Sequence, residues 1–215
     1  MRIVGRDATD SLAAATASPD PHSSRALKEW AAIEQVLAAG ETALLLRKGG
    51  LWERREGFEM EHRQFWIFPT LYHQNPQELK SAHSWALEAA RAAHSGVDRV
   101  RLEHFAVVTD AFRVEDLDVL QVLAADQALT PETIEARFRY RNRPYLHALL
   151  LRVYRRHPSY LVPNTLGYEG CVSWVELDDA LETAGVTPVL GDDRFAEIRA
   201  RVLSVLESGT GAVPV

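Results

Sequence analysis

The chain has 215 residues, of which 47% are hydrophobic, and a formal net charge of -6. This predicts one globular domain and argues against a surface coated in basic residues for non-specific nucleic-acid binding. The single cysteine, Cys171, excludes an internal disulfide, and no apolar run approaches the ~18 residues of a membrane span. The alanine-rich N-terminal stretch is too weakly apolar for a signal peptide, so we expect a cytoplasmic protein without a membrane partner.

The N-terminal residues 1–22 are rich in Ala, Ser, Thr, Asp and Pro, with almost no large apolar residue after Val4. Such a segment cannot bury enough surface to offset the entropy lost on ordering it, which predicts a flexible tail. Residues 23–207 are then the predicted single domain, and residues 208–215 are expected to fray.

The first predicted helix begins at Ser23 or Ser24 and ends near Gly40, because apolar residues recur there at roughly helical spacing. Two apolar runs follow, Leu44–Leu46 and Phe65–Phe68, separated by a glycine pair and a charged loop. Two such runs joined by a turn predict a β-meander or a long hairpin.

The remaining elements mix helices and strands. Helices are predicted over 76–93, 115–127, 130–140 and 194–206, and strands over 99–108, 145–154 and 172–176. Because there is no strict βαβ rhythm, the fold class is α+β, with a mixed or antiparallel sheet covered by several helices. We expect Leu44–Leu46, Phe65–Phe68, Leu149–Leu151 and Trp174 to be largely buried, although a buried helix would also fit the apolar run 145–154.

The first apolar run ends in two cations and two glycines, Arg47, Lys48, Gly49 and Gly50. Backbone amides of glycines beside guanidinium and ammonium groups suit a phosphate or a nucleic-acid backbone. The spacing is not that of a P-loop, and solvated charges on a tight turn would give the same pattern.

A second basic region covers residues 136–168, which contain arginines and interleaved aromatics but no acid. Cations track phosphates and aromatic faces stack on bases, although neutralisation by the acidic stretch 110–135 is the simpler interpretation. The candidate ligands here are Arg137, Arg139 and Arg152, with Arg141 beside them. We hypothesise that at least two of these four line one groove with Arg47 and Lys48, and that Glu61 and His62 lie at its margin.

A possible catalytic or metal-binding group comprises Glu59, Glu61, His62 and His73. Carboxylates and imidazoles bind divalent metals or act as an acid–base pair, for which Glu61 and His62 are the candidates, although local hydrogen bonds would also explain them. The lysine of a restriction-nuclease core is missing after Glu59-Met-Glu61. His73 and Gln74 are candidate ligand-binding residues that could equally cap the following helix.

Several stretches together resemble one known family. They are Ala26-Leu-Lys-Glu-Trp30, Leu44-Leu-Leu-Arg-Lys-Gly-Gly50, Phe58-Glu-Met-Glu-His62, Phe68-Pro-Thr70 with His73–Gln74, Leu151-Arg-Val-Tyr154 and Tyr168-Glu-Gly-Cys-Val-Ser-Trp174. They resemble the bacterial and archaeal domain of unknown function numbered 1802, over about residues 25–177. The resemblance implies no established activity. Some members are joined to a restriction-endonuclease-type domain, which implies a restriction or DNA-defence context, although we expect no such domain within these 215 residues.

These features favour a non-enzymatic module that binds nucleic acid or a phosphate-bearing ligand, with Trp52 or Tyr72 stacking on a base. The alternative is a metal-dependent, nuclease-like phosphoester hydrolase that uses Glu59, Glu61, His62 and His73. A protein-interaction module is the third hypothesis. The sequence specifies neither a metal nor a cofactor.

Overall fold

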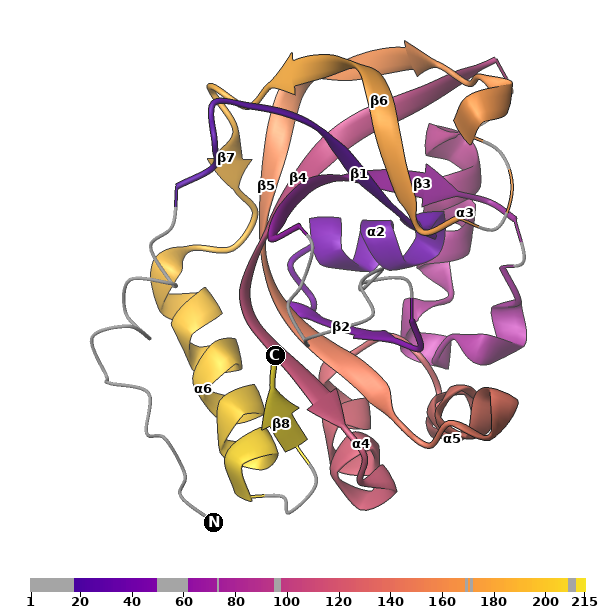
Figure 1. The fold of residues 1–215 in the computed structure, drawn as a ribbon, viewed down its shortest axis with the longest axis vertical. Coiled ribbons are helices and arrows are strands. Elements are labelled where there is room, and N and C mark those ends of the chain that lie inside the picture. Colours follow the sequence, from indigo (N-terminus) through magenta and orange to yellow (C-terminus); the bar gives the residue numbers. More distant parts are fainter. Residues whose placement is uncertain are drawn as a thin grey trace.

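The computed structural model describes residues 18–49, 62–72, 74–94, 98–168, 170, 172–208 and 212–215. In this part of the chain, an eight-stranded sheet has the order β2-β5-β4-β3-β1-β6, with β7 paired to β5 and β8 to β4 (Figure 1). The strands are β1 His22–Trp30, β2 Leu44–Arg47, β3 Gln64–Thr70, β4 Arg99–Val114, β5 Leu146–Pro163, β6 Trp174–Glu182, β7 Thr187–Pro188 and β8 Ala212–Pro214. The helices are α2 Ala31–Ala38, α3 Trp85–Ala93, α4 Leu117–Leu123, α5 Pro131–Arg139 and α6 Asp192–Ser208.

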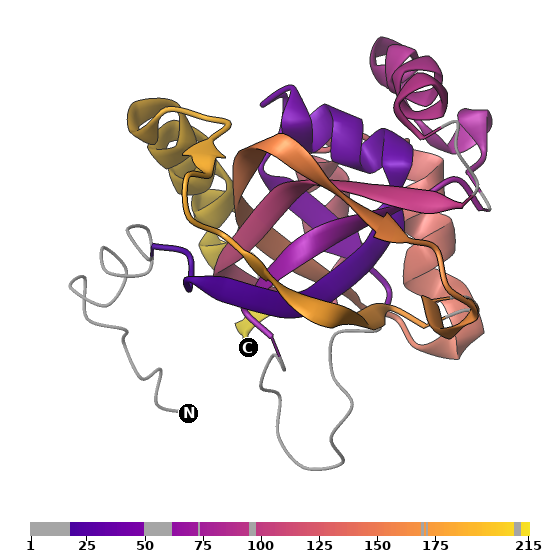
Figure 2. The ribbon, with the colours of Figure 1, turned by 90° about the horizontal axis from the view of Figure 1, so that it is seen from above.

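The sheet is strongly curled. Its two longest strands, β4 and β5, pair antiparallel along almost their whole length, with register shifts between Leu102 and His104 and between Val108 and Asp110. Such irregularities bend a strand and increase its twist. Seen from above, the strands wrap around a common centre, with α6 on one side and α3 and α5 on the other (Figure 2).

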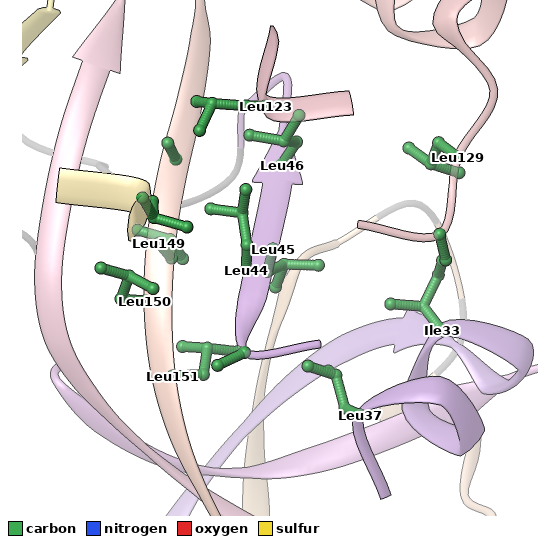
Figure 3. Close-up of a cluster of buried hydrophobic side chains, with 14 of the residues drawn as sticks. Ile33, Leu37, Leu44, Leu45, Leu46, Leu123, Leu129, Leu149, Leu150 and Leu151 are labelled. Atoms are coloured by element: carbon green, nitrogen blue, oxygen red, sulfur yellow. The ribbon is translucent and has the colours of Figure 1, made fainter. Parts of the chain in front are cut away.

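Both faces of β3 are buried. On β3, Phe65 and Ile67 belong to the larger apolar cluster, whereas Trp66 and Phe68 belong to the smaller one. Alternate side chains of a strand point to opposite faces, so each face of β3 carries its own core. Figure 3 shows part of the larger cluster, where the leucines of β2 meet those of β5. The expected burial of Leu44–Leu46, Phe65–Phe68 and Leu149–Leu151 is confirmed, but Trp174 is only partly buried.

The predicted helix from residue 23 to Gly40 is half wrong, because residues 22–30 form β1. This strand pairs in parallel with β3 and antiparallel with β6. Ala26 and Leu27 are both buried, one in each apolar cluster, so the strand lacks the alternation that would have identified it. The helix itself begins at Ala31 and stops before Gly40, whose φ of +70° is the left-handed conformation that follows many helices.

The predicted hairpin between the two apolar runs is also wrong. β2 pairs with β5, and β3 lies between β4 and β1, so two strands separate β2 from β3 in the sheet. The predicted helix over 76–93 is a helix only in its second half, α3. Its first half forms two 3₁₀ turns on either side of Leu79, which bridges to Leu129.

The other predicted strands and helices are present, but β4, β5 and β6 continue past their predicted ends, to Val114, Pro163 and Glu182, and β7 and β8 were not predicted. The α+β class with a mixed sheet is confirmed. Within the described residues, no helix is both long and apolar enough to cross a membrane. Residues 1–17 lie outside the described part, so the limits of the predicted tail and domain remain predictions.

Candidate nucleic-acid interface

A groove of about 1180 Å³ opens where the C-terminal ends of β1, β2 and β3 meet the start of β5. The parallel pairing of β1 and β3 brings their ends to one edge, and β2 ends with Arg47 opposite His147 of β5. Figure 1 shows the ends of β1, β2 and β3 on the side of the molecule that carries α5. Strand ends thus place residues that are far apart in the sequence around one space.

The groove is cationic and aromatic, although the whole chain is acidic. The cations among the described residues that line it are Lys28, Arg47, Lys48, Arg99, Arg137, Arg141 and Arg143. The aromatic residues are Trp30, Phe68, Tyr72, Tyr140, Tyr145 and Tyr168. Glu29 is the acidic residue in this described lining. Its carboxylate is bound to Arg47, so it does little to offset the remaining positive charge.

Arg47 ties the two ends of the curled sheet together. Its Nη1 donates to the Lys28 carbonyl and to Glu29 Oε2, each at 2.8 Å, and its Nη2 reaches Ser173 Oγ at 3.4 Å. β2 is at one end of the strand order, whereas Lys28 and Glu29 belong to β1, next to the other end. The guanidinium of Arg47 therefore connects β2 to β1 across the curled sheet, and its charge is paired with Glu29.

Lys48 binds backbone oxygens at the base of the same groove. Its Nζ donates to the carbonyls of Phe138 at 2.7 Å and Tyr145 at 3.0 Å, and to that of Arg143. Burial, together with the charges of Arg143 and Arg113, lowers the pKa of Lys48. The ammonium group holds the end of α5 against the start of β5, since carbonyls at a helix end lack partners within the helix.

Three exposed arginines of the groove, Arg99, Arg141 and Arg143, form no ion pair with any residue that the structure describes. Arg141 lies in the 3₁₀ turn after α5, with φ of 56°, and its guanidinium carbon is 5.2 Å from the centre of the Tyr140 ring. Tyr140 is 54% exposed and Tyr72 is 79% exposed. In Arg141, a cation without a carboxylate partner therefore lies beside an exposed aromatic ring.

The predicted arginine ligands are divided between this groove and other surfaces. Arg137 lines the groove, where it stacks on Trp30 at 4.6 Å and lies 3.4 Å from Glu78. Arg139 instead pairs with Glu135 one helical turn earlier, and Arg152 pairs with Asp192 and stacks on Phe195 of α6. Neither belongs to the groove lining.

Of the other candidates, Gly49 lines the groove and has open space where a Cβ would stand. Gln74 instead accepts a hydrogen bond from the Ala32 amide at 2.8 Å, which satisfies the first turn of α2. The His62 ring packs edge-on against Trp174, with centroids 5.0 Å apart. The candidates that lie outside the described residues are Gly50, Trp52, Glu59, Glu61 and His73. Within the described residues, no group of three His, Cys, Asp or Glu is placed to hold a metal ion.

A buried carboxylate lies between two imidazoles, an arrangement that was not predicted from the sequence. Glu34 of α2 lies 2.9 Å from His104 Nδ1 and 3.1 Å from His94 Nε2, and its side chain is 1% exposed. Burial raises the pKa of Glu34, but the hydrogen bonds from His104 and His94 outweigh it and hold the pKa below its usual value. The available signal was an acid among the apolar residues Ile33, Val36 and Leu37 of a predicted helix.

His147 lies under the basic groove and edge-on to Tyr145, with ring centroids 5.3 Å apart. Burial lowers the pKa of His147 to about 4, assisted by the charges of Arg113, Lys48 and Arg47. The imidazole is therefore neutral at pH 7.

This neutral histidine predicts an acid-sensitive fold. Between pH 6.5 and about 4, His147 is protonated in the unfolded chain but not in the folded chain. The free energy of unfolding therefore falls as the pH falls through this range. From pH 7.5 to pH 5 the loss from this group is about 2 kcal/mol. We expect urea unfolding of His147→Gln to lack this part of the pH dependence. The control variant, His83→Gln, should keep the pH dependence of the unmodified protein. If His147→Gln keeps it as well, His147 is not the group responsible.

The sequence profile of the family described as "Domain of unknown function (DUF1802)" matches residues 26–201. The chain belongs to this family. Its fold shows a weak likeness to the crystal structure of ASCH from Zymomonas mobilis, at 15% identity and a TM-score of 0.39, covering 71% of this chain and 86% of that one. Two mutant forms of that protein give TM-scores of 0.39 and 0.41, each at 15% identity, covering 71% and 74% of this chain and 88% and 91% of theirs. No curated protein matches the sequence.

Proposed function

We propose that this protein is a cytoplasmic nucleic-acid-binding module, and that the basic groove is its binding site. The observation that carries the proposal is the set of exposed arginines, Arg99, Arg141 and Arg143, without ion-pair partners in the described part of the chain. Gathering like charges has an electrostatic cost, which a bound polyanion would offset. Phosphates of a nucleic-acid backbone are the natural ligands for such a set.

The aromatic lining favours single-stranded nucleic acid over a mononucleotide or inorganic phosphate. Tyr72 and Tyr140 present exposed rings at the groove, and bases stack on such rings regardless of sequence. The groove also exceeds the ~300–1,000 Å³ of common small-molecule pockets. A chain of several nucleotides would place phosphates on the arginines and bases on the tyrosines.

The metal-dependent hydrolase has less support. Three of its four residues, Glu59, Glu61 and His73, lie outside the described part, and His62 faces Trp174. A restriction or DNA-defence setting is a further part of our proposal, and it rests only on the partner domain found in some family members.

Salt-dependent binding tests the proposal. We expect fluorescein-labelled single-stranded 10-mers of RNA or DNA to bind with a log–log salt slope of about -2 or steeper, from three phosphates neutralised at ~0.7 each. The measurement is fluorescence anisotropy between 50 and 300 mM salt, with a neutral-backbone oligonucleotide of the same sequence as the control. Absence of binding at 50 mM salt, or equal binding of the neutral oligonucleotide, would refute the proposal.

A further inference from the structure

His94 lines the groove, and a buried carboxylate fixes which of its two ring nitrogens carries the proton. A carboxylate only accepts hydrogen bonds, so His94 Nε2, 3.1 Å from Glu34 Oε2, must carry a proton. Glu34 Oε1 is held at the same time by His104 Nδ1 at 2.9 Å, which leaves the carboxylate little freedom to turn. In the neutral His94 ring, the lone pair is therefore on Nδ1.

His94 caps the C-terminus of α3 and lines the groove, with 10% of its side chain exposed. Its Nδ1 makes no hydrogen bond to any residue in the described ranges. His104, at 4% exposure, lies behind Glu34 and supports it. The three residues thus hold one hydrogen-bond acceptor at a groove whose charged side chains are mainly donors.

An acceptor of this kind does not suit a phosphate, which offers no proton at neutral pH. It suits a hydroxyl or amino group that lies close to a phosphate. In RNA, every nucleotide carries a 2′-hydroxyl next to its 3′-phosphate, and DNA has no such group. An arginine-bound phosphate would therefore bring a potential donor with it only when the ligand is RNA.

We propose that the groove selects RNA over DNA, because His94 Nδ1 accepts a hydrogen bond from a ribose 2′-hydroxyl. Glu34 is the positioning residue, since it fixes the ring and the protonated nitrogen. The inference rests on the proposed nucleic-acid binding and adds the class of nucleic acid to it.

Matched uridine oligonucleotides isolate the hydroxyl. Oligo(U) and oligo(dU) 10-mers carry the same base and differ only at the 2′ position, and 2′-fluoro-oligo(U) favours the RNA sugar pucker but cannot donate. One hydrogen bond predicts that oligo(U) binds about 3- to 10-fold more tightly than either analogue. His94→Ala is expected to reduce that ratio to about 1 while it keeps the salt slope, which the arginines set.

The matched control is His83→Ala. His83 also faces a carboxylate, with Nε2 3.1 Å from Glu41 Oε2, but it is not part of the groove lining. The His83→Ala variant should leave the preference for oligo(U) over its two analogues unchanged. Equal binding of oligo(U) and both analogues by the unmodified protein would overturn RNA selection while leaving nucleic-acid binding intact. A ratio that survives in His94→Ala would overturn the role of His94, and a failure of all three ligands to bind would refute the proposed function itself. The ratio in the unmodified protein does not depend on whether a variant folds.

Discussion

Replacing Arg99, Arg141 and Arg143 together with glutamine is expected to weaken single-stranded nucleic-acid binding on the order of 10³-fold at low salt. The three side chains are exposed, line one groove and have no ion-pair partner among the described residues. Each lost charge-assisted hydrogen bond to a phosphate costs about 1.5 kcal/mol, and three such losses multiply to this factor. The log–log salt slope should become shallower by about 2.

The same change in net charge can be made outside the groove. Arg91, Arg139 and Arg194 lie on helices, are exposed and are not part of the groove lining. Their combined replacement with glutamine should reduce affinity much less, because these side chains do not line the groove and the solvent and salt around exposed charges weaken their long-range attraction for a ligand. If both triple variants lose affinity equally, net charge and not the groove determines binding.

The groove lining differs from the ligand set of the sequence-based hypothesis. That hypothesis placed Arg139 and Arg152 among the ligands, but the structure puts Arg139 on an exposed helix face and Arg152 beneath α6. The sequence shows that cations are dense between residues 137 and 156. It does not show which way each side chain points, since that depends on strand pairing between distant segments.

Much of the fold was accessible from local patterns. The apolar runs of β2, β3 and β5 and the helical spacing of α6 are properties of neighbouring residues. The identity of β1 was not accessible, because its buried residues face two different cores and its partners, β3 and β6, lie about 40 and 150 residues further along the chain. Local propensity is a weak guide where such tertiary pairing decides the structure.

The site, like the fold, was predictable only where local sequence patterns determine it. Apolar runs that end in cations predicted that Arg47 and Lys48 would meet a distant arginine-rich segment, and the groove lining contains Arg47, Lys48 and three arginines of that segment, Arg137, Arg141 and Arg143. The sequence could not reveal that Arg47 and Lys48 are already bound to backbone oxygens. Any residue can supply a carbonyl, so the partners of Lys48, some ninety residues away, leave no mark in the sequence.

Arg47 should therefore be needed for stability. We expect Arg47→Met to lower the free energy of unfolding by about 3 kcal/mol, the lower end of the range for breaking a buried ion pair. The variant removes the ion-pair partner of the Glu29 carboxylate, which is 11% exposed, and the side-chain donor to the Lys28 carbonyl. Urea unfolding measures the loss, and Arg141→Gln, an exposed cation of the same groove, should change stability by less than about 0.5 kcal/mol.

A double-mutant cycle separates the ion pair from the loss of side-chain packing. If Glu29 is costly only because its partner is gone, adding Glu29→Gln to Arg47→Met should recover part of the lost stability. The expected coupling energy is about 1–3 kcal/mol, as for residues in direct contact. Two results would contradict this stabilising role: a coupling energy near zero, or an Arg47→Met protein that is stable but no longer binds nucleic acid. Either result would indicate that Arg47 is a ligand-binding residue. Arg47 would then contact phosphate, and a different interaction would have to hold the two ends of the sheet together.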